Sequence, residues 1–351
     1  MKRLRNTIIR AGLGALYFSG AHVLLRPIFS GVGAIFMLHN VRPPRADDFQ
    51  PNRHLEVTPE FLRMMLTHLR SRGIDIVTMD EVHHRLMNRK FDRRFACLTF
   101  DDGYRDNRDY ALPVMREFAA PVTIFIASDF AQGSGRLWWV ALEMAIAKAS
   151  TIDVTIGGNA LRLDASNAQA KQAAFDRLHD WLRSLPEHDL QREVIALCAR
   201  HGVDQAAICS NLCMSWNELK AFASDPLVSI GAHTITHCNL AHQSEEVARE
   251  EMTVSRARIE EKLQRAVVHL AYPYGDRAAA GAREFALAAS SGYKTAVTTR
   301  PGMVFPESSR HLTALPRVSL NGNYQERRIL PVLTSGAATA MWNGFRRVDA
   351  G

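Results

Sequence analysis

The chain has 351 residues, of which 47% are hydrophobic and 23% are charged, a balance typical of a soluble globular protein. This length is sufficient for one large α/β barrel with insertions or for two domains of ordinary size, with a core that needs no cross-links. The formal net charge of +7 is compatible with an anionic partner, although a basic but otherwise ordinary enzyme surface is the default interpretation. The sequence has no zinc-finger spacing and no aromatic RNA-binding signature, so we expect no nucleic-acid function.

Residues 1–33 form a basic and apolar segment. Four of the first ten residues are basic: Lys2, Arg3, Arg5 and Arg10. The apolar stretch at 11–25 is shorter than the about 20 residues that span a bilayer, and Ser19-Gly-Ala21 is a poor signal-peptide cleavage site. We therefore expect an uncleaved helix that covers the barrel or contacts a membrane surface peripherally.

Cysteine usage bears on the compartment. The five cysteines form no regular framework, and an odd number cannot all pair within one chain. Cys97 lies in an apolar run and is expected to be a small core residue. This usage favours a reducing compartment, so we expect a cytoplasmic or membrane-peripheral protein, with an exported form as the alternative.

Eight short apolar runs are typical of parallel strands that are covered on both faces. They lie at 34–38, 74–78, 96–100, 122–126, 227–230, 267–271, 295–298 and 315–320. Helical patterns fall between most of them; one follows Thr58-Pro59, and another runs from Ser244 to Leu263. Alternation of this kind predicts a barrel or a wound sheet.

An insertion of mainly helical pattern separates the fourth and fifth runs, at 131–226. Apolar residues recur there at helical spacing, at Phe175, Leu178, Leu182, Leu190, Val194 and Leu197. Ser215 and Glu218 form a capping box for a further helix. Trp138 and Trp139 open the insertion, where core packing is the default and stacking on a sugar ring the alternative.

Two carboxylates directly follow the third run, in Thr99-Phe-Asp-Asp-Gly-Tyr104. Sites in parallel α/β folds are built at the carboxyl ends of strands, and a charge that emerges from an apolar strand needs a metal or a cation as partner. Asp101 and Asp102 are therefore candidate site residues. The alternative is a strand end followed by a helix N-cap, because aspartate caps helices well.

Two histidines follow the fifth run, in Gly231-Ala-His-Thr-Ile-Thr-His237. Placed four apart on one helical turn, His233 and His237 would point the same way, which suits two metal ligands. Solvent-facing loop histidines are the alternative. After the sixth run, Ala271-Tyr-Pro-Tyr-Gly-Asp276 forms a tight loop that can aim the Tyr274 amide at a developing oxyanion, although the motif alone is a turn.

In this order, with strands between them, the three motifs resemble those of the polysaccharide deacetylases of carbohydrate esterase family four. That family includes nodulation-type chitooligosaccharide deacetylases, and the resemblance covers about 34–130 and 227–320. It implies an α/β fold, a distorted (β/α) barrel with about seven parallel strands. We expect the barrel at 34–130 and 227–335, the insertion between them, and a C-terminal tail at 336–351.

The resemblance also implies roles for the motif residues. Asp101 would be the general base, and Asp102, His233 and His237 would bind a divalent metal, usually zinc. One carboxylate and two imidazoles leave coordination positions for water and for a substrate oxygen. The metal and the Tyr274 amide would share the oxyanion, and a general acid is needed because an amine leaves poorly unless it is protonated.

The sequence departs from the family pattern at two places. Ala271 stands where the family has an arginine that pairs with the base; Arg317, on the last predicted strand, is our hypothesis for its replacement. The late Leu-x-His motif that supplies the acid is also absent, because Leu330-Pro-Val carries no histidine. His39, at the end of the first run, is the expected substitute, with His311 as a less favoured candidate.

The resulting prediction is a metal-dependent hydrolase that removes N-acetyl groups from an oligo- or polysaccharide containing N-acetylglucosamine. O-acetyl carbohydrate ester hydrolysis passes through the same tetrahedral oxyanion and remains an alternative. A non-catalytic carbohydrate-binding subunit is a third reading, favoured by the two departures and disfavoured by the intact Asp101, Asp102, His233 and His237.

Overall fold

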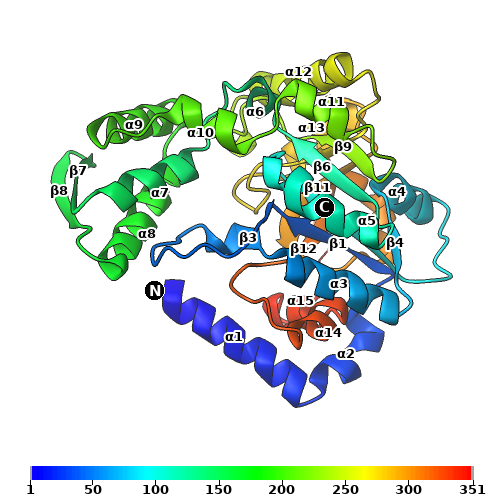
Figure 1. The fold of residues 1–351 in the computed structure, drawn as a ribbon. Coiled ribbons are helices and arrows are strands. Elements are labelled where there is room, and N and C mark those ends of the chain that lie inside the picture. Colours follow the sequence, from blue (N-terminus) through cyan, green and yellow to red (C-terminus); the bar gives the residue numbers. More distant parts are fainter. Residues whose placement is uncertain (1, 349–351) are drawn as a thin grey trace.

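Seven parallel strands close into a barrel at the centre of the computed structural model, which describes residues 2–348 (Figure 1). Around the ring the strands are β1 (Gly33–Leu38), β12 (Leu315–Ser319), β11 (Thr295–Pro301), β10 (His269–Ala271), β9 (Val228–Ala232), β6 (Val122–Ile126) and β5 (Phe95–Phe100). β5 pairs with β1 from Gly33↔Phe95 to Leu38↔Phe100, which closes the ring. An additional strand, β4 (Asp75–Val77), pairs with the first half of β5. The predicted distorted (β/α) barrel is confirmed.

The strands form where the apolar runs lie, because both of their faces are covered. Every residue of β1, β5 and β6 is buried. Surrounding helices are α3 (Pro59–Ser71), α4 (Met79–Met87), α5 (Leu112–Glu117), α6 (Ser128–Gln132), α11 (Trp216–Phe222), α12 (Glu245–Leu263) and α13 (Ala282–Ser290). Thr58 and Ser244 cap α3 and α12, each accepting a hydrogen bond from a backbone N–H of the first turn.

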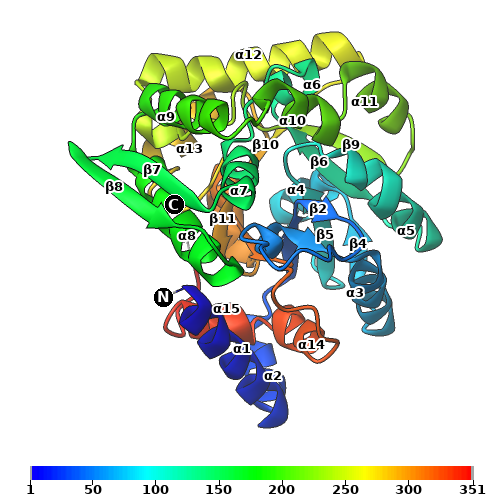
Figure 2. The same cartoon turned by 60° about the vertical axis from the view of Figure 1, so that its left-hand side comes forward.

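The inserted segment lies to one side of the barrel and has its own core (Figures 1 and 2). Its helices are α7 (Trp138–Lys148), α8 (Ala168–Ser184), α9 (Glu187–Arg200) and α10 (Gln205–Leu212). It also contains an antiparallel hairpin, β7 (Thr151–Ile156) and β8 (Asn159–Asp164), that the helical pattern did not predict. The turn is Gly157-Gly158, with φ of 58° and 81°, a pair that favours two-residue hairpin turns.

The first two and the last two helices pack together beneath the barrel (Figure 1). Residues 1–33 were expected to hold one helix, but the structure has two, α1 (Lys2–Phe18) and α2 (Ala21–Phe29), separated at Gly20, whose φ is 73°. They pack on α14 (Ile329–Thr334) and α15 (Ala337–Trp342), so the expected tail is partly helical. Among residues 2–348 no single helix has the length and composition of a membrane span. Helices α1 and α2 reach them only when counted together, and their axes are bent by 92° relative to each other.

The carboxyl ends of the barrel strands face the inserted segment. Two short parallel strands, β2 (Asn40–Val41) and β3 (Glu56–Val57), follow β1 and border this edge. The terminal helices lie near the opposite edge, since Arg94, just before β5, donates hydrogen bonds to the Ser30 and Thr334 carbonyls. This arrangement leaves the carboxyl edge of the barrel open for a site.

Candidate active site

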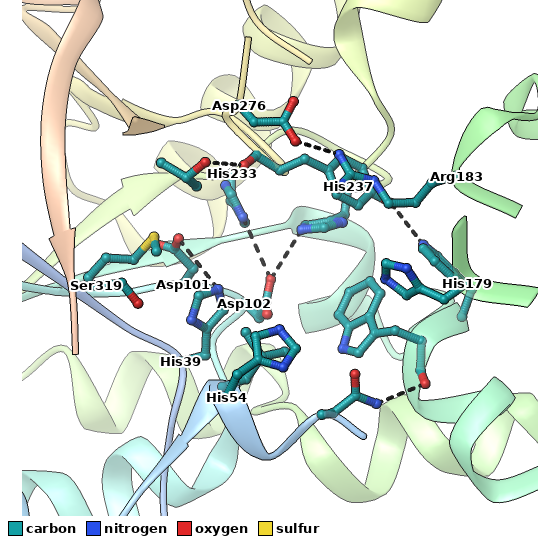
Figure 3. A pocket seen from close by; sticks show the side chains of 17 residues that line it. His39, His54, Asp101, Asp102, His179, Arg183, His233, His237, Asp276 and Ser319 are labelled. Atoms are coloured by element: carbon teal, nitrogen blue, oxygen red, sulfur yellow. Dashed lines mark hydrogen bonds and ion pairs between the residues drawn. The ribbon is translucent and has the colours of Figure 1, made fainter. Parts of the chain in front are cut away.

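A cavity of about 300 Å³ lies between the carboxyl ends of the barrel strands and the inserted segment (Figure 3). Barrel residues lining it are His39 after β1, Asp101 and Asp102 after β5, His233 and His237 after β9, and Tyr274 after β10. The opposite wall consists of Trp138, Trp139, His179 and Arg183. Four segments far apart in sequence are thus brought to one site, as expected for the carboxyl edge of a parallel barrel.

Asp102, His233 and His237 form a buried cluster with the geometry of a metal site. Their ligand atoms all lie within 4.8 Å of one another. Asp102 Oδ1 is 3.6 Å from His233 Nε2 and 3.4 Å from His237 Nε2. Ligands at about 2.1 Å from a tetrahedral ion are about 3.4 Å apart, so these separations suit such an ion.

The donor atoms of this cluster are also in a suitable state. His233 Nδ1 donates to the Ala271 carbonyl at 2.7 Å, so the lone pair of the neutral ring is on Nε2, the nitrogen that lies toward Asp102. Asp102 Oδ1 is buried and has no hydrogen-bond partner among the described residues. Burial, followed by the Asp101 charge, raises the pKa of Asp102 well above its usual value, so its ionised form needs a nearby cation.

Several residues at the site have positive φ, a backbone conformation that is normally adopted by glycine. Within residues 2–348, eight residues other than glycine have positive φ, and four of these are at the site: Asp102, Thr234, His237 and Tyr274. Such residues cost free energy and are concentrated at functional sites. The expectation that His233 and His237 share a helical turn is wrong. They lie on a loop in which Thr234 and His237 have positive φ, and both Nε2 atoms are within 3.6 Å of Asp102 Oδ1.

That loop is held by two side chains of α12 that sequence reasoning missed. Glu251 accepts hydrogen bonds from the amides of Ile235 and Thr236 at 2.8 and 3.0 Å and from the Thr236 hydroxyl at 2.7 Å. The Ser255 hydroxyl donates to the Thr234 carbonyl at 2.7 Å. Glu251 was concealed in a charged helical pattern, where buried and solvent-facing carboxylates look alike.

Arg317 lies inside the barrel and pairs with Asp101. Its NH1 and NH2 groups donate to the two Asp101 carboxylate oxygens at 2.8 and 2.7 Å, and its Nε donates to the Thr298 carbonyl at 2.9 Å. The residue is 1% exposed. The structure thus brings to Asp101 a cation from β12, on the far side of β11 from Ala271.

This pair fixes the charge state of Asp101. Burial acts to raise its pKa, but Arg317, together with His233 and His39, outweighs burial and holds the pKa of Asp101 below its usual value. Both carboxylate oxygens accept from one planar guanidinium, so the carboxylate is also fixed in orientation.

Tyr274 is half-buried and lies beside the Asp102–His233–His237 cluster. Its hydroxyl accepts a hydrogen bond from Trp138 Nε1 at 2.8 Å, and its ring contacts His237 with centroids 5.1 Å apart. Trp138 and Trp139 are both buried, so core packing is their main role, although both border the cavity. Arg183 of α8 stacks over the Tyr274 ring at 4.8 Å and pairs with Asp276 at 2.8 Å, which joins the inserted segment to the β10 loop.

Histidines other than the cluster also line the cavity. His39 Nε2 is 3.9 Å from Asp101 Oδ2. Burial and the Arg317 charge lower the pKa of His39 to about 4, although the Asp101 charge acts to raise it. The His39 ring is therefore neutral at neutral pH. His54 and His179 also face the cavity, and no motif marked them in the sequence (Figure 3). His311 precedes β12, borders a different cavity and is not brought to the site.

The parallel barrel thus carries an Asp-His-His cluster and a paired aspartate at its carboxyl edge, as the resemblance to the polysaccharide deacetylases implied. The family model "polysaccharide deacetylase" matches residues 88–156 and 166–296, more than half of the chain, and the chain belongs to this family. The predicted family is confirmed. Membership implies a hydrolase that acts on acetylated carbohydrate.

Solved structures share the fold at low sequence identity. The Streptococcus pyogenes deacetylase PplD in complex with acetate is 18% identical, with a TM-score of 0.55 over 83% of this chain and 92% of that one. BC0361, a polysaccharide deacetylase from Bacillus cereus, is 16% identical, with a TM-score of 0.53 over 86% and 68%. IcaB from Ammonifex degensii is 16% identical, with a TM-score of 0.51 over 88% and 97%. Comparison with curated proteins gives no match.

Replacing Arg317 by methionine is expected to destabilise the protein by about 3–5 kcal/mol at pH 7, because Asp101 is left as an uncompensated buried charge. In the wild type the pKa of Asp101 lies below its unfolded value, so the pair stabilises the fold above about pH 4 and this stabilisation is lost as the pH falls. In Arg317→Met, no guanidinium opposes the effect of burial, so the pKa of Asp101 is raised. The loss of unfolding free energy relative to the wild type therefore increases with pH. Denaturant unfolding at pH 5 and pH 7 measures both effects.

The matched control for this change is Arg63→Met. Arg63 also makes a two-hydrogen-bond pair with a carboxylate, donating from Nε and NH2 to Glu117 at 2.8 Å each, but this pair lies on an exposed surface. Its removal is expected to change stability far less, because exposed ion pairs contribute little. Equal losses for Arg63→Met and Arg317→Met would contradict the importance given to burial of the Asp101 pair.

Replacing Glu251 by alanine is expected to weaken metal affinity about 10- to 100-fold, because the loop that orients His233 and His237 loses three hydrogen bonds. Calorimetric titration of chelator-stripped protein with zinc measures the change. Glu250→Ala, at the exposed neighbouring position of α12, is the control and is expected to bind as the wild type does. An unchanged affinity in Glu251→Ala would show that the loop holds its shape without this carboxylate.

Proposed function

We propose that this protein is a metal-dependent deacetylase that removes N-acetyl groups from an oligo- or polysaccharide containing N-acetylglucosamine. The observation that carries the proposal is the placement of the Asp102–His233–His237 cluster and the Asp101–Arg317 pair in one cavity. The first provides ligands for an ion, and the second provides an ionised carboxylate beside it.

Zinc is the metal that we propose for the cluster. One carboxylate oxygen and two imidazole nitrogens are ligands that zinc prefers, and a three-residue set leaves positions open for reactants. The ion, when bound, would polarise the acyl oxygen and increase the acidity of the attacking water. Asp102 Oδ1, buried and without a hydrogen-bond partner among the described residues, supports a cation at this place.

Asp101 is proposed as the general base. Arg317 keeps it ionised and directs it, so the carboxylate can accept the proton of the attacking water as the new C–O bond forms. The missing arginine at Ala271 favoured a non-catalytic reading of the sequence. Arg317 supplies a buried cation to the same carboxylate, so the alanine at position 271 does not disfavour catalysis.

The Tyr274 amide is proposed to stabilise the oxyanion. Its N–H donates no hydrogen bond to any described residue, and the loop that carries it is held by the Thr299 hydroxyl, which donates to the Tyr274 carbonyl. A fixed amide of this kind stabilises the negative charge that develops on the acyl oxygen.

His39 is proposed to deliver the proton to the leaving nitrogen. Its ring is neutral at rest, so it must gain a proton before it can give one, and Asp101 Oδ2 at 3.9 Å is the neighbouring group that has just accepted one. The proton would pass from water to Asp101, then through His39 to the nitrogen as the C–N bond breaks. Acetate and a free amine are the products.

Asp101→Asn is expected to lower turnover about 100- to 10,000-fold while bound metal is retained, because the amide cannot accept the proton. Amine release from N-acetylated chitooligosaccharides measures turnover, and chelation followed by zinc addition should abolish and restore it. Acetate release from acetylated xylan without amine formation would redirect the proposal to an O-acetyl esterase. Sugar binding that persists in Asp101→Asn, with no acetate from any substrate, would indicate a binding subunit.

His39→Ala is expected to lower turnover about 100-fold with unchanged metal content, because the leaving nitrogen loses its proton donor. His311→Ala, outside the cavity, is the control and should retain full activity. Undiminished turnover in His39→Ala would exclude His39 and direct attention to His54, the other histidine on that wall.

A further inference from the structure

Helix α2 exposes an apolar face that the rest of the protein leaves uncovered. None of its residues is buried, and Val23, Leu24 and Ile28 are 60%, 77% and 53% exposed. At 100° per residue, positions 23, 24, 27 and 28 lie on one side of the helix. Phe18, at the end of α1, is 73% exposed beside them in sequence. Contiguous apolar surface of this kind marks an interaction site.

The C-terminal segment enlarges this surface. The rings of Phe29 and Phe345 are in edge contact at 6.2 Å, and Phe345 is 57% exposed. Arg347 NH2 donates a hydrogen bond to the Ile28 carbonyl at 3.2 Å, which fixes the segment beside α2. We refer to Phe18, Val23, Leu24, Ile28 and Phe345 together as the terminal apolar face.

Positive charge surrounds the terminal apolar face. The first acidic residue of the chain is Asp47, and positions 327–348 contain none. A cavity of about 90 Å³ opens beside Val23 and is lined by His22, Arg26, His68, Arg72 and Arg94. Arg26 and Arg72 form no ion pair with any residue between 2 and 348, and Arg94 Nε is buried there without a hydrogen-bond partner.

Burial and the positive electrostatic potential in this cavity lower the pKa values of His68 and Arg94, which line it. Burial, then Arg72, Arg26 and Arg327, lowers the pKa of His68 to about 4. Burial and Arg26 lower the pKa of Arg94 to about 10. The charged neighbours that shift both groups are all cationic, so an anion placed here would relieve mutual repulsion.

We propose that the terminal apolar face docks this protein peripherally on an anionic phospholipid bilayer, with a lipid phosphate in the cavity beside Val23. Apolar side chains would enter the acyl boundary while the flanking arginines contact phosphates, as in interfacial amphipathic helices. A second copy of the chain fits less well, because it would place one arginine-rich surface against another.

This docking leaves the active site open. Helix α2 lies near the amino ends of the barrel strands (Figure 2). The cavity that contains Asp102, His233 and His237 lies at their carboxyl ends. Helix α1, with 17 residues and a length of about 25 Å, runs between the two. Its residues Arg5 and Asn6 border a cavity that is shared with His54, His179 and Arg183. In a docked molecule the active-site cavity would therefore lie at a fixed distance from the lipid surface.

Co-sedimentation of the full chain with phosphatidylcholine vesicles, with and without phosphatidylglycerol, tests the proposal. We expect binding to the anionic vesicles that high salt releases. Leu24→Asp should weaken it at least about tenfold, the equivalent of one leucine side chain left in water, and Arg26→Glu should weaken it on anionic vesicles. Ile195→Asp, at an exposed apolar position of α9, and Arg192→Glu on the same helix are the controls and should bind normally.

Unchanged melting temperatures would show that the variants fold, since both positions on α2 are exposed. Equal binding of Leu24→Asp and the wild type would overturn the proposal, as would a wild-type protein that stays in the supernatant. Protein that is released only by detergent would instead indicate insertion of α1 and α2. A concentration-dependent dimer that Leu24→Asp dissociates, without lipid binding, would assign the face to a second copy.

Discussion

The ion pair between Arg317 and Asp101 is the interaction on which the site depends. Both groups are buried in the barrel, and each would destabilise the fold without the other. Their pairing requires β12 and β5 to hold a fixed distance across β1, which is the strand that closes the ring. A barrel that opened at β1 would therefore lose the orientation of Asp101 together with its core.

The Asp102–His233–His237 cluster is attached to the barrel strands through short loops that contain residues with positive φ. Asp102 directly follows Asp101 and has a positive φ, so the strand end that carries Asp101 also fixes the position of the Asp102 backbone. His233 is tied to the β10 carbonyl of Ala271, and the loop to His237 is tied to α12 through Glu251. The inserted segment then covers the cluster, with Trp138 hydrogen-bonded to Tyr274 and Arg183 paired with Asp276. Each ligand is thus positioned by a different element, and the fixed barrel is what makes their convergence reproducible.

Much of this could be predicted from the sequence, because the strands are local apolar runs and the motifs follow them directly. All eight predicted strands are present, and Asp102, His233 and His237 converge as their strand ends require. The loop around His237 was mistaken for a helical turn because residue spacing carries no information on φ. The partner of Asp101 could be only a hypothesis, since the contact joins residues 216 positions apart. The Gly157-Gly158 hairpin had a signal, alternating apolar residues around two glycines, that the surrounding helical pattern obscured.

The metal content of the purified protein, determined by elemental analysis for the wild type, Asp102→Ala and Asp101→Asn, distinguishes the roles of the two aspartates. Asp102 is assigned to hold the ion, and Asp101, its neighbour, to hold only a proton and Arg317. We expect one equivalent of divalent metal in the wild type and in Asp101→Asn, and its loss in Asp102→Ala. Equal metal content in Asp102→Ala and the wild type, or none in a wild type given zinc, would contradict the assignment of Asp102 as a metal ligand.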